Sequence, residues 1–309
     1  MKDTFSLSLR EVADEFCKDF FARMVEYDDT GNYVKEFADV VTQVDLDNED
    51  SIRKILHVYQ KGLDLGAIFG EENGYEKIGD GVNVAIVDPI DGTRCFVMEI
   101  FYSSVSIGFV DDEGDLKGGI LIVINNQKSK KDFTRYETFL VSMGKVWHRV
   151  GLEPFVQFEF PKLKSIGLNE ACVSLTDVGS YTKQWPENSV HNRDGEKIHR
   201  LLKMHSRCGM SFCSGAVEIM SVVSGRLGGF INLGKNSVVS HLVALMIADL
   251  NSEISIHHVY DKGNDFSIDL NKLMEKGVSE CCFWGGDGSV IVANGSIELA
   301  TKVKDVVAK

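Results

Sequence analysis

The sequence lacks the features of several large protein classes. It has no excess of basic residues, since 33 Lys and Arg stand against 46 Asp and Glu, and the net charge is −13. Nucleic-acid-binding surfaces are basic because they neutralise phosphates, so we expect no nucleic-acid partner. No run reaches the roughly 18 to 20 apolar residues of a membrane span. Arg10, Glu11 and Asp14 interrupt the N-terminal segment, which argues against a signal peptide. We therefore expect a cytoplasmic protein without a membrane partner.

Two further absences concern cysteine and glycine motifs. The seven cysteines are an odd number and none are spaced C-x-x-C, which favours free thiols over a disulfide framework. No G-x-G-x-x-G follows an expected strand, which argues against a dinucleotide-dependent oxidoreductase. The sequence also shows no internal repeat.

Helical and strand patterns mix along the 309 residues without a strict βαβ order, so we expect a layered α/β or α+β fold. Polar stretches place a boundary near residues 150–170, which gives two lobes, 1–165 and 166–309. The expected helices span 8–26, 48–64, 197–204, 213–225, 237–250 and 296–307. The expected strands span 82–87, 103–110, 118–124, 139–146, 171–176, 228–233 and 289–293, and residues 67–70 form a short apolar run.

The stretch D88-P-I-D-G-T93 follows the apolar strand at 82–87. Asp88 and Asp91 can converge if the chain turns there, because Pro89 fixes φ and Gly92 permits a tight bend. Two carboxylates held together repel, and a divalent cation removes that cost. Oxygen ligands suit magnesium, manganese or calcium rather than zinc. If a helix starts next, its free N–H groups add a phosphate site.

A lone D-x-x-D would favour an ordinary Asp-rich turn, but each residue of the longer motif has a separate role. Glu71, in the pair Glu71-Glu72, lies about one strand upstream and could supply a third carboxylate. Asp45 is a weaker candidate, because the acidic stretch D45-L-D-N-E-D50 by itself is typical of a solvated helix start.

Seven motifs, taken together, resemble the inositol monophosphatase superfamily, which comprises lithium-sensitive, magnesium-dependent phosphatases. The resemblance covers nearly the whole chain in order and implies a layered αβαβα sandwich with two lobes, often found as a homodimer. The motifs are V41-T-Q-V-D45, G70-E-E72, D88-P-I-D-G-T93 with Phe96, S103-S-V-S-I-G-F109, V173-S-L-T-D-V-G-S180, the segment S214–G234, and V290-I-V-A-N294.

The resemblance also implies a role for each site residue. Mg²⁺, or Mn²⁺ in its place, would activate water for in-line displacement of an alcohol from a phosphomonoester. Thr93, oriented by Asp45, would position that water together with Glu71. The implied metal ligands are Glu71, Asp88, the carbonyl of Ile90, and Asp91. The implied phosphate and substrate contacts are Asp91, Gly92, Thr93, Ser180, Gly215 and Asn232.

The second motif of the superfamily is a Trp-Asp pair that opens a helix, and this sequence has other residues in its place. Counting forward from the well-matched segment S214–G234 places the pair on Val238 and Val239, so the second metal lacks a carboxylate. A shift of one or two residues would instead bring in Ser240, His241 or the amide of Asn236.

Two substrate-side positions also differ from the superfamily. Asn232 stands where inositol-handling members have a glutamate, and Gly228 stands where many have an aspartate. Both changes weaken the case for inositol phosphate itself.

Two functions remain open from the sequence. The first is a magnesium-dependent phosphomonoesterase for a small phosphorylated metabolite, such as an inositol, sugar or polyol phosphate or a nucleotide 3′-phosphate. The complete set of first-lobe residues favours it. The alternative is a catalytically impaired relative, a pseudo-phosphatase that binds metal and a phosphorylated ligand, which Val238-Val239 favours.

Overall fold

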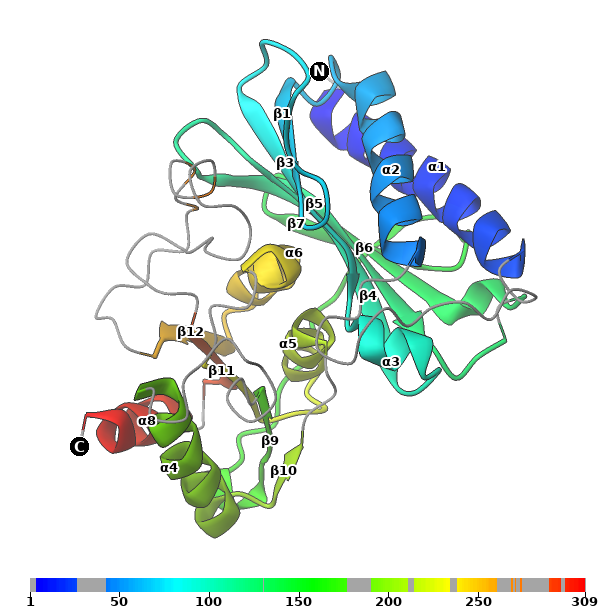
Figure 1. Cartoon of the computed structure of the whole chain (residues 1–309). Coiled ribbons are helices and arrows are strands. Elements are labelled where there is room, and N and C mark those ends of the chain that lie inside the picture. Colours follow the sequence, from blue (N-terminus) through cyan, green and yellow to red (C-terminus); the bar gives the residue numbers. More distant parts are fainter. Residues whose placement is uncertain are drawn as a thin grey trace.

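The computed structural model describes residues 4–26, 43–129, 131–176, 190–210, 214–233, 238–259, 289–295 and 298–308, with positions 268, 270 and 273. Its elements stack as five layers in the order αβαβα (Figure 1). The layered α/β expectation is therefore confirmed. The helices are α1 Thr4–Glu26, α2 Gln43–Tyr59, α3 Thr93–Val97, α4 Val190–His205, α5 Gly215–Val223, α6 Val238–Asp249 and α8 Leu299–Val307.

Two sheets form the β layers. The first has eight strands in the order β2-β1-β3-β4-β5-β6-β7-β8, and the second has five in the order β10-β9-β11-β13-β12. The strands of the first sheet are β1 Leu65–Gly70, β2 Gly74–Lys77, β3 Asn83–Asp91, β4 Tyr102–Val110, β5 Leu116–Asn125, β6 Tyr136–Ser142, β7 Lys145–Val150 and β8 Val156–Gln157. Those of the second are β9 Cys172–Thr176, β10 Cys208–Met210, β11 Gly229–Asn232, β12 Ile254–His258 and β13 Val290–Asn294.

Three apolar cores hold the layers together. Alternate residues of a strand face opposite sides of a sheet, and β3 follows this rule. Val87 faces the core under α1 and α2, whereas Ile86 faces the core that contains α5 and α6. Residues of both sheets contribute to that central core, so α5 and α6 lie between the sheets. A third core packs α4 and α8 on the outer face of the second sheet.

Several element boundaries differ from the expectations, two of them as follows. The strand expected at 139–146 is a hairpin, because Met143 and Gly144 adopt positive φ values of 52° and 68° between β6 and β7. Two such residues form the tight turn that matches the twist of paired strands. Helix α2 begins at Gln43 rather than at 48, so the acidic stretch lies inside the helix. Among the described helices, none combines the length and the hydropathy required to cross a bilayer.

The expectation of free thiols is wrong for one pair of cysteines. Cys172 and Cys208 are directly opposite on the parallel strands β9 and β10 and form a disulfide. A count of cysteines could not reveal this pair, since the two residues are 36 positions apart and come together only in the folded sheet. Cys17 and Cys95 are buried and remain thiols.

Reduction of the Cys172–Cys208 disulfide should lower the free energy of unfolding by about 2–4 kcal/mol, because the bond restricts the unfolded chain across a loop of this length. Urea unfolding with and without dithiothreitol measures the difference. The double variant Cys172→Ser/Cys208→Ser should be insensitive to reductant. An unfolding curve of the parent protein that does not move on reduction would contradict the prediction.

Candidate active site

The segment that carries the two aspartates forms an irregular end to strand β3. Asp88 pairs with Ser106 of β4 and Asp91 with Ser104, so three steps on β3 face two on β4. This is a β-bulge, which re-aims side chains locally. Gly92 then adopts φ 85° and ψ 38°, a left-handed conformation that glycine adopts without strain, and α3 begins at Thr93. The expected strand, tight turn and helix start are all present.

Thr93 and Asp45 meet although 48 positions separate them in the sequence. The Thr93 hydroxyl lies 2.9 Å from the Ile90 carbonyl oxygen and 3.2 Å from Oδ1 of Asp45, and it can donate its one proton to either. Asp45 lies in the first turn of α2 and is buried. The hydroxyl is therefore held between a carboxylate and a backbone carbonyl.

Glu71 and Asp88 form a hydrogen-bonded carboxyl pair. Desolvation raises the pKa of Glu71 to about 8, with added repulsion from Glu72, Asp91 and Asp45. The Glu71 residue is exposed, so water or a bound cation can screen its charge and reduce this shift. Burial and the charges of Glu71 and Asp91 likewise raise the pKa of Asp88 well above its usual range. Without a cation, the pair therefore holds a proton near neutral pH.

These features fit a divalent cation. Oδ1 of Asp88 is buried and has no hydrogen-bond partner, and the donors around it are oxygens that repel one another. Within the described ranges, no three Asp, Glu, His or Cys side chains are grouped as a ready-made metal site. A cation here would therefore take its remaining oxygens from water, from the Ile90 carbonyl or from a substrate phosphate.

Asp91 links the two halves of the chain. Its Oδ2 accepts hydrogen bonds from Ser214 Oγ at 2.7 Å, from the Ala216 N–H at 3.0 Å and from Ser104 Oγ at 3.3 Å. A carboxylate at a helix N-terminus satisfies free N–H groups and interacts favourably with the helix dipole. Asp91 thus fixes the start of α5 against the first sheet.

Gly215 lies directly against His241 of α6. A Cβ atom at position 215 would stand 1.8 Å from His241 Nε2, so only glycine fits without movement of the ring. The ring is buried, and burial lowers the pKa of His241 while the charge of Asp91 opposes that shift. His241 is therefore enclosed beside the aspartate.

The residue of α6 that meets Asp88 is Ser240. Its hydroxyl is hydrogen-bonded to the Asp88 carboxylate, whereas Val239 is fully buried in the central apolar core. The superfamily position counted onto Val239 thus differs by one residue from the side chain that reaches the cluster. Neither residue supplies a carboxylate.

Glu49 is a buried residue that sequence reasoning missed. Its Oε2 accepts the N–H of Glu72 at 2.8 Å and its Oε1 accepts the N–H of Asn73 at 3.0 Å. Arg53 pairs with the same carboxylate at 2.8 Å. A Cβ at Gly70 would lie 2.0 Å from Glu49 Oε1. Glu49 therefore fixes the turn that carries Glu71, and the i, i+4 spacing of Glu49 and Arg53 was the available signal.

Burial of this segment overturns the expectation of a solvated helix start, since Asp45, Asn48 and Glu49 are all buried. The substrate-side residues are only partly described. Asn232 is fully buried at the end of β11 and pairs with Thr176 of β9. Ser180 and Asn236 lie outside the described residues.

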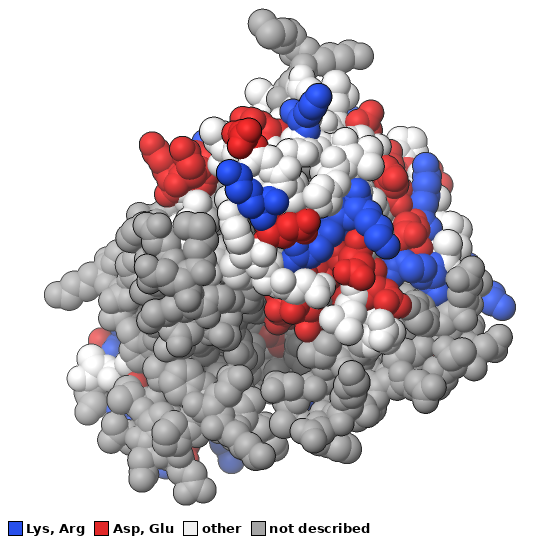
Figure 2. Space-filling model, turned by 45° about the horizontal axis from the view of Figure 1, so that its top comes forward, with Lys and Arg blue, Asp and Glu red and all other residues white. Residues whose placement is uncertain are grey.

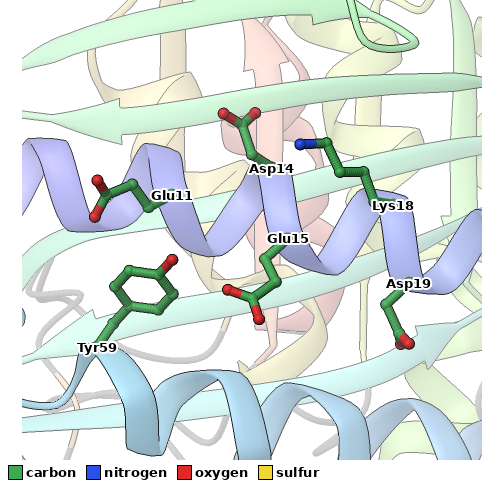
Figure 3. Close-up of a pocket in the computed structure, with 6 residues that line it drawn as sticks. All are labelled: Glu11, Asp14, Glu15, Lys18, Asp19 and Tyr59. Atoms are coloured by element: carbon green, nitrogen blue, oxygen red, sulfur yellow. The ribbon is translucent and has the colours of Figure 1, made fainter.

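A separate acidic groove of about 630 Å³ lies between α1 and α2 (Figure 3), lined by Glu11, Asp14, Glu15, Lys18, Asp19 and Tyr59. Tyr59 ends α2 and Asp45 is near its start, which places them about 21 Å apart along the helix. The groove is therefore distinct from the aspartate cluster.

Acidic and basic side chains lie side by side on the face shown in Figure 2, where the described surface carries both signs of charge.

Comparison with known proteins identifies the family. Residues 5–239 match the sequence profile of the inositol monophosphatase family, and the chain belongs to this family. The bifunctional NADP phosphatase/NAD kinase of Methanocaldococcus jannaschii is 26% identical over 207 residues, 63% of this chain and 34% of that protein. An uncharacterized protein of Sinorhizobium fredii is 27% identical over 198 residues, 64% of this chain and 59% of that protein. The match thus spans about a third and three fifths of these relatives' lengths.

Solved structures confirm the fold. The extragenic suppressor protein suhB of Bartonella henselae superposes with a TM-score of 0.66 at 19% identity, covering 97% of this chain and 98% of that one. The IMPase of Thermotoga maritima gives a TM-score of 0.60 at 20% identity, covering 98% and 94% of the two chains.

Proposed function

We propose that the chain is a magnesium-dependent phosphomonoesterase that hydrolyses a small phosphorylated metabolite. The observation that carries the proposal is the cluster of Glu71, Asp88, Thr93 and Asp45, which come from three separate segments of the chain. Two carboxyl groups held together without a cation between them, one of them buried, cost free energy, so the arrangement needs a functional reason.

In this proposal, Glu71, Asp88 and the carbonyl of Ile90 would hold the cation, and Asp91 would contact the substrate. Bound Mg²⁺ would supply Lewis acidity and a more acidic water. The Thr93 hydroxyl orients the attacking water, because Asp45 and the Ile90 carbonyl fix its position. Gly92 exposes its backbone to the phosphate because it has no side chain.

The alternative is a pseudo-phosphatase that binds metal and a phosphorylated ligand without turnover. It is favoured by the absence of a carboxylate at both Val239 and Ser240, where the superfamily supplies a ligand of the second metal. The same experiment separates the two proposals.

Phosphate release should be measured on a panel of inositol, sugar, polyol and nucleotide phosphates, NADP included, with Mg²⁺, Mn²⁺ or chelator. The phosphatase proposal expects release that chelator abolishes. Thr93→Val should lower kcat by about 10²-fold because the water loses its oriented partner, while Thr93→Ser keeps the hydroxyl and most of the activity. Metal-dependent ligand binding without release on any compound would favour the pseudo-phosphatase.

A further inference from the structure

Buried polar side chains connect strands β4 and β5 to the glycine that precedes α3. Ser103, on β4, and Asn126, directly after β5, are 0% and 3% exposed. The Ser103 hydroxyl donates to the Gly92 carbonyl at 3.0 Å, and Asn126 Nδ2 donates to Ser103 Oγ at 2.8 Å. Apolar residues at both positions would avoid the cost of burying polar groups, so these hydrogen bonds call for an explanation.

Arg135 sets the direction of these hydrogen bonds. Its guanidinium donates to Asn126 Oδ1 at 3.3 Å. Arginine has donors only, so the amide turns its oxygen toward Arg135 and its nitrogen toward Ser103. Because Ser103 Oγ accepts from that nitrogen, its single proton is directed to the Gly92 carbonyl. Arg135, Asn126 and Ser103 thus form a hydrogen-bond relay that ends on Gly92.

The end of the relay controls a backbone N–H. The Gly92 carbonyl and the Thr93 N–H belong to one planar trans peptide unit, in which the two groups point in opposite directions. A hydrogen bond that holds the carbonyl therefore also fixes the direction of the N–H. Ser103 and the Phe96 N–H, each at 3.0 Å, both contact this carbonyl. Gly92 needs such support, because a glycine backbone is less restricted than that of any other residue.

We propose that Ser103 and Asn126 are positioning residues that aim the Thr93 N–H at the phosphate group of the substrate. The inference rests on the proposed function, in which Gly92 and Thr93 contact that phosphate. Neither positioning residue touches the substrate, and both act through the Gly92–Thr93 peptide. An N–H that is already aimed binds an anion without first being reoriented, which favours binding.

Ser103→Ala removes the hydroxyl and leaves the Phe96 N–H as the remaining support of the Gly92 carbonyl. The dissociation constant of inorganic phosphate, measured by calorimetric titration of the full chain in saturating Mg²⁺, should rise by about 10-fold, the effect of roughly one hydrogen bond. The dissociation constant of Mg²⁺ without phosphate should stay the same, because Ser103 donates to Gly92 rather than to a proposed metal ligand. A purely structural role would not separate the two constants.

Asn126→Asp tests the direction of the relay in a side chain of nearly the same shape. A carboxylate still accepts from Arg135, but it also accepts the Ser103 proton and withdraws it from Gly92. Phosphate binding should therefore weaken about as much as in Ser103→Ala. The double variant Ser103→Ala/Asn126→Asp should lose little more than either single variant, because both changes break one relay. Additive losses, or an unchanged phosphate affinity in the folded single variants, would overturn the assignment.

Ser142→Ala is the matched control. Ser142 is another buried serine of the first sheet, and its hydroxyl is hydrogen-bonded to Ser6 Oγ. It pairs with Gly118 of β5, whereas Ser103 pairs with Ile124, so about 20 Å of β5 separates the two positions. Phosphate affinity should be unchanged in this variant. Ser103→Thr, which keeps the hydroxyl, should retain most of the affinity that Ser103→Ala loses.

The backbone amide resonances report on the peptide itself and do not require turnover. In ¹⁵N-labelled protein with Mg²⁺, inorganic phosphate should shift the Thr93 amide resonance, and Ser103→Ala should reduce that shift. A parent protein that hydrolyses substrate without a response at Thr93, or that binds no phosphate, would reject the relay and leave hydrolysis to be explained by other contacts. If phosphate binds with the expected effects and no compound is hydrolysed, the relay is supported and the phosphatase function is rejected.

Discussion

Asp88→Asn is expected to abolish metal-dependent phosphate release, with a fall in kcat of roughly 10³-fold or more. Asparagine keeps the shape of the side chain, but it removes the charge from the most buried oxygen ligand of the proposed cation site. Loss of several kcal/mol of transition-state stabilisation corresponds to a rate factor of that size. Initial rates of phosphate release at saturating Mg²⁺ measure the effect.

Although Asp88→Asn should abolish turnover, it should not lower the stability of the protein when metal is absent. Asp88 and Glu71 repel each other whenever both are ionised, and a neutral amide removes that repulsion. In chelator, the melting temperature of Asp88→Asn should therefore equal or exceed that of the parent. Added Mg²⁺ should stabilise the parent alone, because a ligand stabilises only the folded form that binds it.

Asp111→Asn provides the matched control. Asp111 is also a buried aspartate, but it pairs with Lys117 at 2.6 Å in the turn between β4 and β5. Its loss should cost some stability and leave both turnover and the response to Mg²⁺ in place. An Asp88→Asn protein that hydrolyses substrate as fast as the parent would show that the cluster is not the catalytic site.

The parts of the site that could be predicted from the sequence are those that local chain geometry determines. The turn from Asp88 to Thr93 follows from an apolar strand, a proline, and a glycine whose left-handed conformation the structure shows. The layered fold was predictable because strands such as β3 carry consecutive apolar residues, so both faces of the sheet need cover.

The other parts depend on contacts between distant segments. Asp91 accepts the Ala216 N–H across 125 positions, and no local pattern marks that contact. Glu49 belongs to an acidic stretch that is solvated in most helices, and only the turn at Glu72 and Asn73 explains its burial. The Cys172–Cys208 pair likewise depends on the order of strands in the second sheet.

Helix α6 shows how a difference of one position changes the chemistry of a site. Successive residues of an α-helix point about 100° apart, so Val239 and Ser240 face different surroundings. A count along the chain placed the missing metal ligand at the position of Val239. In the structure, the backbone carbonyl of Val239 accepts from Ser106 at 3.4 Å, its side chain belongs to the apolar core, and Ser240 reaches Asp88.

Ser240→Asp and Val239→Asp are therefore expected to have opposite outcomes. Ser240→Asp adds a carboxylate beside Asp88, which should weaken the fold in chelator and increase both the affinity for Mg²⁺ and the stabilisation that Mg²⁺ provides. Val239→Asp places an unpaired charge in the apolar core and should cost about 3–5 kcal/mol, with no recovery on adding Mg²⁺. Urea unfolding and calorimetric titration with Mg²⁺ measure the two effects.

Val243→Asp is the control for burial of a charge, because Val243 lies one turn further along α6 and is also fully buried in the central core. It should be destabilised as much as Val239→Asp and should be equally unresponsive to metal. If Val239→Asp instead gained Mg²⁺-dependent stability and Ser240→Asp did not, the count along the chain would be correct and position 239 would face the aspartates. If neither variant gained it, α6 would contribute no metal ligand at either position, and the cation would depend on Glu71, Asp88 and the substrate.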